Sequence, residues 1–421
     1  MTVVDQSWGM TSTTTAPTPT PAAARIQHRT GFWIIALAFL TAMAFCAVPT
    51  PLYAIYQRRD GFPTIVLTVI FGAYAVGVML SLYLAGHVSD RMGRRRIIVA
   101  SLGVNLAAAI LFLVWNDVAG LIVARFVSGL GIGVLAAAAT AYLAELGAAA
   151  GGSGGRSALV ATFANLGGIG LGPLVGGLIA TWSARPLVVP YVLFALLFAA
   201  EGILVALVPE TVEQKTEHQA YRPQRIAIPV ERRGAFWAAA LGASAAFAVF
   251  GTFMGLSSTF LAGVLGLQSA LLTGVAPSVV FLAAAAAQAV TARLPIALQL
   301  RLAVALAVCG LAAVGVSALA ASLALFLAGG GVAGAGIGIL FRSALATTAA
   351  IAGPERRGEA LAGIFLIAYA GMTVPPLLTA VALGVWPAVT VLVVLSTAGI
   401  ALVIVSGSAM LRGFTHRLRT R

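Results

Sequence analysis

Charged residues are scarce in this chain of 421 residues. They make up 9% of the sequence, whereas an average soluble domain contains about 25%. Hydrophobic residues reach 60%, and the mean hydropathy is +1.02. So few charges cannot cover a surface that faces water on all sides, which excludes a soluble enzyme and also the fibrous and disordered classes. The composition therefore predicts a membrane protein with many spans.

Cysteine and histidine are also nearly absent. Cys46 and Cys309 each stand inside an apolar run, so they offer neither a disulfide framework nor a metal site. The four histidines fall at the ends of apolar runs or in the tails: His28, His87, His218 and His416. No nucleophile–base pair can be drawn within the spans, so we expect no enzymatic activity, no cofactor and no metal. The phosphate-binding pattern of ATP-driven pumps is missing too.

Twelve apolar runs are long enough to cross about 30 Å of hydrocarbon as helices. They are 32–55, 64–85, 97–115, 118–143, 157–180, 187–208, 235–261, 269–292, 301–318, 321–343, 358–382 and 387–410. Residues 1–30 are rich in Thr, Pro and Ala and are expected to form a disordered tail rather than a signal peptide. The predicted fold is an all-α polytopic membrane protein.

The basic residues predict the orientation of these spans. With the N-terminus inside, the inner segments hold 21 of the 25 Lys and Arg residues, and the outer loops hold Arg58, Arg59 and Arg185. This asymmetry predicts a multi-pass protein of the cytoplasmic (inner) membrane with both termini cytoplasmic. The net charge of +13 is spread between the spans rather than gathered in one patch, so we expect no nucleic-acid partner.

The chain repeats itself at an offset near 205 residues. Gly129, Gly131 and Gly133 match Gly334, Gly336 and Gly338, and the Gly31 and Gly234 regions open the first and seventh spans alike. The repeat predicts two six-helix bundles, 31–208 and 234–410, joined by a cytoplasmic linker at 209–233 and followed by a basic tail at 411–421. Two such halves that rock around a central site are a transporter design, and one monomer suffices for it.

Three motifs stand out in the first half of the chain. The loop between spans two and three follows the pattern G-x-x-x-D-R-x-G-R-[RK], with Gly86, Asp90, Arg91, Gly93, Arg94 and Arg95 at its constrained positions. Span four contains Arg125 and Gly129, and span five contains Gly168, Gly172, Pro173, Gly176 and Gly177. These motifs resemble the loop motif, the buried-arginine motif and the antiporter pattern of the major facilitator superfamily, in a 12-span branch similar to drug/proton antiporters. Pro209, Glu210 and Thr211 close span six as in many members of that family.

The loop motif predicts a conformational latch. A carboxylate at Asp90 can accept backbone N–H groups at a neighbouring helix start, where the helix dipole favours an anion. Arg91 and Arg94 can pair with Asp90 or with Glu145, forming a charge cluster that changes when the halves separate. The alternative is that the arginines only anchor the inner surface, which is the expectation for Arg95 and Arg96.

Two charged residues lie well inside spans. Arg125 is about 10 Å below the outer surface, where an arginine is costly unless it faces a polar cavity or snorkels to the headgroups. The resemblance implies that it tunes proton release from an acid. Glu201, in span six, is the one carboxylate well inside a span and is a candidate proton carrier. Span six is peripheral in the family, so a structural Glu201 is an equal alternative.

Candidate substrate contacts are few. Pro49 and Pro51 are expected to break span one near its outer end, because proline removes backbone donors. Further polar or aromatic groups on spans expected to line a cavity are Tyr53, Asn165, Gln288 and Tyr369. A helix–helix hydrogen bond is the alternative for each of them. The glycines of span ten favour close packing over a site.

The sequence therefore predicts a secondary active transporter in the lipid bilayer that is driven by the proton gradient. Export of small amphipathic compounds, as by multidrug antiporters, is favoured by the Gly172 and Pro173 motif. The alternative is a proton-coupled importer of a sugar, an organic acid or another metabolite, because span one lacks the carboxylate that many proton-linked drug exporters carry.

Overall fold

The computed structural model describes residues 26–85, 92–212 and 232–419. All regular elements within these ranges are helices, and twelve stretches are long and apolar enough to cross a membrane. The predicted all-α fold with twelve spans is confirmed. About half of the spans extend several residues beyond the predicted runs; the first span, for example, covers His28–Asp60.

The first six spans are built from helices that precede residue 207. They are α1 (His28–Ala47), α2 (Pro49–Asp60), α3 (Thr64–Ala85), α5 (Arg94–Val114), α6 (Val118–Ala149), α7 (Gly154–Thr162), α8 (Gly168–Trp182) and α9 (Val189–Ala206). A single turn of π-helix, Phe163–Gly167, joins α7 to α8 within the fifth span. We refer to these helices as the N-terminal half.

The last six spans follow residue 232 and form the C-terminal half. Its helices are α10 (Arg233–Leu265), α11 (Ala270–Val290), α12 (Ile296–Leu319), α13 (Leu323–Ala382) and α14 (Ala388–Arg419). A short 3-10 turn, Thr291–Arg293, precedes α12. The long element α13 carries two spans, Leu323–Ala352 and Ala360–Ala382.

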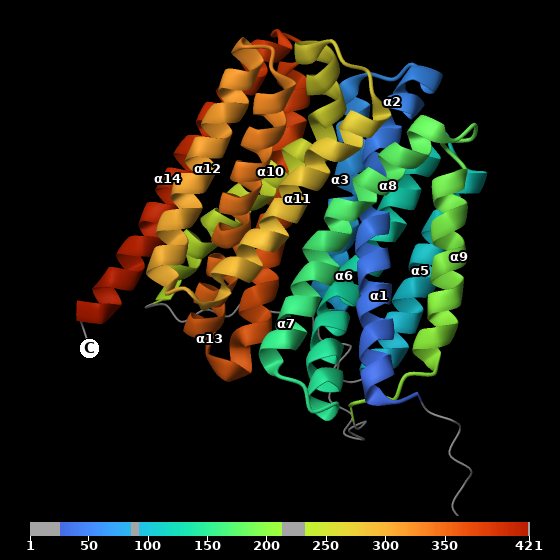
Figure 1. Ribbon diagram of the computed structural model, residues 1–421, viewed down its shortest axis with the longest axis vertical. Coiled ribbons are helices and arrows are strands. Elements are labelled where there is room, and N and C mark those ends of the chain that lie inside the picture. Colours follow the sequence, from blue (N-terminus) through green and yellow to red (C-terminus); the bar gives the residue numbers. More distant parts are fainter. Residues whose placement is uncertain (1–25, 86–91, 213–231, 420–421) are drawn as a thin grey trace, which may run out of the picture.

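The two halves stand side by side, blue to green and yellow to red in Figure 1. Within each half, the helices pack closely where glycine removes a side chain. In α13, a Cβ added at Gly334 would strike the carbonyl of Val280, and one at Gly338 would strike Ala284, both on α11. These glycines therefore serve packing, as the sequence predicts. Across the halves, α8 contacts α11 and α3 contacts α13.

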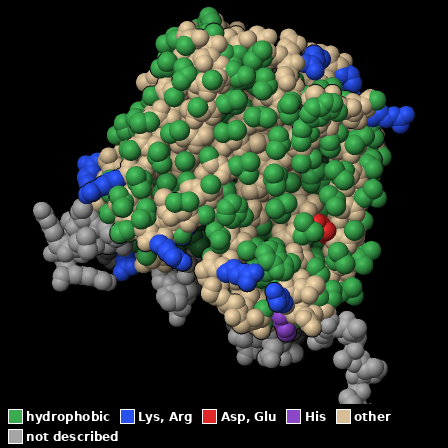
Figure 2. Space-filling view, in the orientation of Figure 1, with side chains coloured by type: hydrophobic (Ala, Val, Ile, Leu, Met, Phe, Trp, Pro, Cys, Tyr) green, Lys and Arg blue, Asp and Glu red, His purple; other side chains and the backbone are tan. Residues whose placement is uncertain are grey.

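The surface has the pattern of a membrane protein. Figure 2 shows a broad belt of hydrophobic side chains, with Lys and Arg confined to its two edges. Arg94–Arg96, Arg156, Arg232 and Arg233 lie at the end where α1 begins, which we call the basic end; the other is the opposite end. Burial differs between spans: 78% of the most apolar window is buried in the first span, but only 22% in α14.

Candidate functional site

Arg125 lies on α6, seven residues from its start, and its side chain is 1% exposed. The Nη1 atom donates to the backbone carbonyl of Cys46 at 2.6 Å, and the guanidinium carbon lies 4.5 Å from the ring centroid of Tyr74 and 6.0 Å from that of Phe71. The side chain is thus held inside the bundle and does not snorkel to the headgroups.

The partner of Arg125 is a helix end. Helix α1 stops at Ala47 because Pro49 and Pro51 have no backbone N–H, and α2 begins directly at Pro49. The last carbonyls of a helix lack internal partners and carry the negative end of its dipole. Arg125 caps one of them with a positive charge. The break expected at the two prolines is small, because Val48 keeps a helical backbone conformation and the two helices form one span.

Tyrosines surround this arginine and reach the other half. Tyr53 and Tyr74 lie beside Arg125, and Tyr74 interacts with Tyr369 of α13 across the boundary between the halves. We call Cys46, Tyr53, Tyr74, Arg125 and Tyr369 the central cluster. Among the described residues, the buried Tyr53 hydroxyl and the Arg125 Nε have no hydrogen-bond partner. Tyr53 and Arg125 thus bring a phenol and an N–H donor close together inside the cluster, where both atoms are buried.

Glu201 lies elsewhere. It is 3% exposed on α9, and its Oε1 accepts a hydrogen bond from the Thr41 hydroxyl of α1 at 2.7 Å. Its Oε2 has no hydrogen-bond partner within the described part of the chain. Arg125 is bound to a carbonyl and Glu201 to a hydroxyl, so the two residues expected to act in proton coupling are not brought together.

Helix α8 presents glycine on two faces. A Cβ at Gly168, Gly172 or Gly176 would strike the backbone carbonyl of Leu40, Ala44 or Val48, so this face packs against α1 and the residue that follows it. Gly170 and Gly177 instead face Leu282 and Ala270 of α11, in the other half. Reciprocally, a Cβ at Gly274 of α11 would strike the carbonyl of Pro173. The motif thus provides close backbone contact both within a half and between halves.

A crevice of about 450 Å³ opens between the halves at the opposite end. Helix α2 lines one wall and helices α10 and α11 line the other, with polar side chains from both: Gln57, Arg58, Ser258, Thr259, Gln268, Ser269 and Thr273. Pro51 also lines it, one turn of helix from Val48. The crevice opens between the halves at the opposite end and is a candidate access route.

At the basic end, the residues after α9 hold the start of α5. The Glu210 carboxylate accepts from the backbone N–H groups of Arg94 at 3.0 Å and Arg95 at 3.1 Å. Gly93 precedes them with φ of 93°, and a Cβ there would lie 2.5 Å from Glu210 Oε2. Glu210 therefore caps a helix that is preceded by a glycine, which has no capping side chain of its own. The anion expected to occupy such a position was Asp90.

The Arg94–Glu145 pair expected from the loop motif is present. Arg94 Nε lies 3.2 Å from Glu145 Oε1, and the Thr211 hydroxyl donates to Glu145 Oε2 at 2.5 Å. Tyr142 also donates to the carbonyl of Pro209 at 2.5 Å. These contacts join α5, α6 and the end of α9 within one half. Gly86, Asp90 and Arg91 lie outside the described residues, and the latch between halves stays a prediction.

Replacing Glu210 with alanine is expected to lower stability. The change removes the acceptor of two helix-terminal N–H groups and a charge that favours the helix dipole, which together contribute about 1–2 kcal/mol. A fall of several degrees in the thermal unfolding of purified protein measures the effect. Glu210→Gln keeps an acceptor without the charge and should fall between the two; equal midpoints for all three proteins would contradict the capping role.

The other candidate contacts differ in their surroundings. Gln288 Nε2 donates to the carbonyl of Gly338 at 2.9 Å, so it ties α11 to α13. Asn165 is half-buried in the π-helical turn before α8. Tyr369 packs edge-on against Phe247 with ring centroids 5.2 Å apart. Of the sequence candidates, Tyr53 and Tyr369 join Arg125, whereas Gln288 has a structural partner. Tyr74 and the Cys46 carbonyl were missed, because a backbone atom and a lone tyrosine leave no motif.

Comparison with known proteins gives a consistent family assignment. A family model described as Major Facilitator Superfamily matches residues 33–316. Among curated proteins, the arabinose-proton symporter of Bacillus subtilis (strain 168) is 31% identical over 77 residues. That match covers 18% of this chain and only 17% of the symporter.

Two solved structures share the fold. The human organic anion transporter MFSD10 (TETRAN) aligns with a TM-score of 0.67 at 18% identity, covering 91% of this chain and all of that one. A bacterial homolog of the human lysosomal transporter Spinster, in an inward-facing and unoccupied conformation, aligns with a TM-score of 0.63 at 13% identity, covering 94% and 98%. At such identities the likeness concerns the fold.

Proposed function

Since the chain belongs to the Major Facilitator Superfamily, we propose that it moves a small molecule across the cytoplasmic membrane by alternating access and exports amphipathic compounds in exchange for protons. Secondary transport follows from the family. Direction, substrate class and coupling are the proposal. The observation that carries it is the α8 motif, whose glycines bring the backbones of two helices together at the boundary between the halves.

The contacts across that boundary suit a rocking motion. The faces of α8 and α11 meet through Gly177, Gly274 and the Pro173 carbonyl, so they can part without breaking an ion pair. The central cluster contains side chains of both halves, and the crevice opens between the same halves at the opposite end. Binding at the cluster and opening at alternate ends would move a substrate across.

The alternative is proton-coupled import of a sugar, an organic acid or another small metabolite. The unpartnered Arg125 Nε and Tyr53 hydroxyl favour a substrate with a carboxylate or carbonyl group. The short match to a protein named as a symporter also leans this way. Direct measurement of proton flux distinguishes an anionic metabolite from an amphipathic compound as the substrate.

The test uses inverted vesicles that are energised to an acid interior and contain the wild-type protein. Addition of an exported substrate is expected to release protons and restore the fluorescence of a pH dye, within a panel of amphipathic amines, neutral drugs, sugars and organic acids. Recovery with an amphipathic compound supports export. Recovery with none, together with proton-dependent uptake of a sugar or acid into intact cells, would establish the alternative.

The Glu201→Gln variant tests whether Glu201 carries the proton in coupled transport. If Glu201 carries the proton, uphill transport is expected to fall at least tenfold, while substrate exchange without a proton gradient continues. Thr41→Val removes the hydroxyl that binds Glu201 but keeps the acid, so it serves as the matched control for packing at this position. Retained uphill transport with an unchanged pH profile in Glu201→Gln would give Glu201 a structural role.

A further inference from the structure

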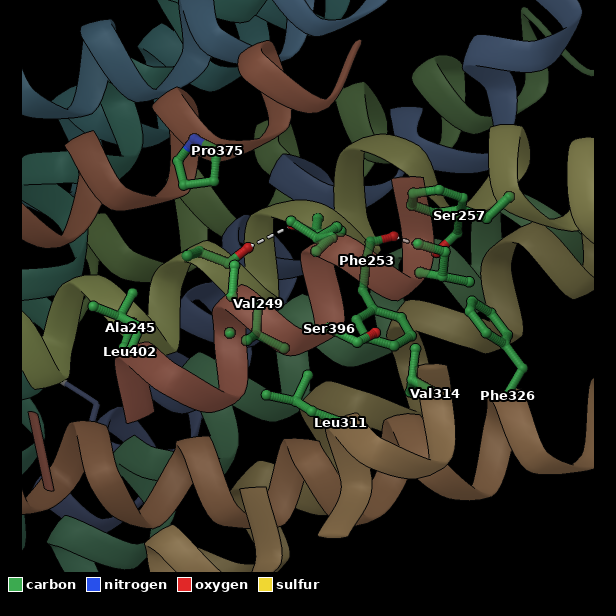
Figure 3. A pocket seen from close by; sticks show the side chains of 17 residues that line it. Ala245, Val249, Phe253, Ser257, Leu311, Val314, Phe326, Pro375, Ser396 and Leu402 are labelled. Carbon is green, nitrogen blue, oxygen red and sulfur yellow. Dashed lines mark hydrogen bonds between the residues drawn. The ribbon is translucent and has the colours of Figure 1, made fainter. Parts of the chain in front are cut away.

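The C-terminal half contains a cavity of about 160 Å³ between α10, α12, α13 and α14 (Figure 3). Val249 and Phe253 of α10 line it, together with Leu311 of α12 and Phe326 and Pro375 of α13. The cavity lies inside one half and is separate from the crevice between the halves. An engineered apolar cavity of about 150 Å³ stays dry and takes up benzene.

The lining is apolar in character. The hydroxyl of Thr252 donates to the carbonyl of Ala248 at 2.8 Å, and the hydroxyl of Ser257 donates to the carbonyl of Phe253. Both hydroxyls are thus satisfied by the turn of α10 that precedes them, as the dashed lines in Figure 3 mark. Ser396 of α14 adds one further hydroxyl to the lining, and the other lining side chains are hydrocarbon, so the cavity suits an apolar ligand.

The cavity reaches the molecular surface beside α14. Ala398 lines it and is exposed, and its neighbours Leu395 and Gly399 are half-buried. Ala398 is ten residues from the start of α14, which places it about 15 Å from that end of the span. The exposed side of α14 at this depth faces the hydrocarbon of a bilayer. The natural entrance is therefore from the membrane interior.

The internal repeat identifies the same space in the N-terminal half. Phe32 and Trp33 of α1 match Phe236 and Trp237 of α10, which pairs Thr41 with Ala245 and Phe45 with Val249. Gly202 and Ile203 of α9 match Gly399 and Ile400 of α14, and Pro190 in the first turn of α9 matches Pro387, which directly precedes α14. This register pairs Phe198 with Leu395 and Glu201 with Ala398. Helix α9 packs on α1 and α5 as α14 packs on α10 and α12.

In the N-terminal half this space is filled. The rings of Phe45 and Phe198 meet edge-on with centroids 5.1 Å apart, and Thr41 binds Glu201. Further rings complete the packing: Phe112, Tyr191 and Phe194. The four counterparts in the C-terminal half all line the cavity, and each is smaller: Ala245, Val249, Leu395 and Ala398. The loss of two rings, a hydroxyl and a carboxyl accounts for the open volume.

We propose that this cavity is a binding site for a hydrocarbon chain that enters from the bilayer beside Ala398. The chain belongs either to a membrane lipid or to the alkyl part of an amphipathic solute. Both have the same chemistry within the cavity, where Val249 and Leu395 contact the methylene groups and no headgroup is accommodated. The site is independent of the central cluster and of the direction of transport.

Photolabelling of the purified full-length protein in nanodiscs tests the site. One probe is phosphatidylcholine with a diazirine in the middle of an acyl chain, and the other is dodecanol with a diazirine on its chain. Adducts on the peptides that contain Val249 and Leu395 are expected from at least one probe. Labelling by the lipid probe identifies a membrane lipid as the source; labelling by dodecanol alone identifies a solute.

Filling the cavity provides the decisive comparison. Val249→Phe with Leu395→Phe rebuilds the ring pair of the other half, and at least a tenfold loss of these adducts is expected. Ala398→Trp closes the entrance and should cause the same loss of adducts. Because Ala398 is exposed, this variant is expected to fold even if the double variant folds poorly. Leu378→Phe, on an exposed face of α13, is the control and should leave the adducts unchanged. Absence of adducts in the wild type, or their persistence in the folded variants, would overturn the proposal.

Discussion

Gly274→Leu is expected to increase the exposure of the crevice between the halves and to reduce transport at least tenfold. Any side chain at this position meets the carbonyl of Pro173, so leucine forces α11 away from α8. Overpacking costs about 1–3 kcal/mol. If the state in which these helices touch bears this cost, its population falls about 5- to 150-fold relative to the separated state.

The exposure is measured by the rate at which a membrane-impermeant maleimide modifies Thr259→Cys in the crevice, with Cys46 and Cys309 replaced by alanine. Gly202→Leu, at a helix position with open space around it, is the matched control and should leave the rate unchanged. Gly172→Leu strikes α1 within the same half and should reduce the folded yield instead. Unchanged labelling in Gly274→Leu would show that α8 and α11 do not part in the cycle.

Arg125→Ala is expected to lower transport at least a hundredfold at normal protein levels. The substitution removes a charged hydrogen bond to the Cys46 carbonyl, which contributes about 1.5–3 kcal/mol, and a desolvated cation–π contact with Tyr74 that contributes about 2 kcal/mol. A hundredfold change corresponds to about 2.7 kcal/mol. Arg125→Lys should not restore function, since its ammonium group lacks the planar fork of donors.

Arg342→Ala serves as the matched control for this substitution. Arg342 donates Nη1 to the carbonyl of Gln288 at 2.5 Å, so the control loses the same type of bond away from the central cluster. We expect both variants to lose thermal stability, Arg125→Ala the more because it also loses the cation–π contact, and transport to be lost only in Arg125→Ala. If both variants transported equally well, the role of Arg125 would be limited to capping the end of α1.

The spans follow from the sequence because the bilayer imposes one rule on each of them, a run of about 20 apolar residues. The site depends on contacts between helices, and no comparable pattern along the sequence reveals them. The Pro49 and Pro51 pair was expected to break a helix near its outer end; in the structure the break is small, and it provides a helix end that Arg125 caps. That role becomes visible only when α1 and α6 are placed side by side.

For other residues too, the partner in the structure differs from the one that the sequence suggested. In the sequence, Glu210 belongs to a stretch that closes span six as in many members of the family. Only the fold shows that its carboxylate lies at the start of α5. Arg125 and Glu201 looked like a pair because they are the two charges well inside spans, yet each found a neutral partner. The cavity is visible in the internal repeat of the sequence, because Phe45 of α1 and Phe198 of α9 correspond to residues without rings in α10 and α14.

The glycine faces of α8 also bear on the entropy of closure. When two surfaces of long side chains meet, each side chain loses rotamer freedom, about 0.5–2 kcal/mol at each position. Gly177 and Gly274 have no rotamers to lose, and their helices meet backbone to backbone. Closing this boundary therefore orders almost nothing, and reopening it releases almost nothing. Closure at this boundary therefore depends on backbone packing and on the bound molecule, and not on the ordering of side chains.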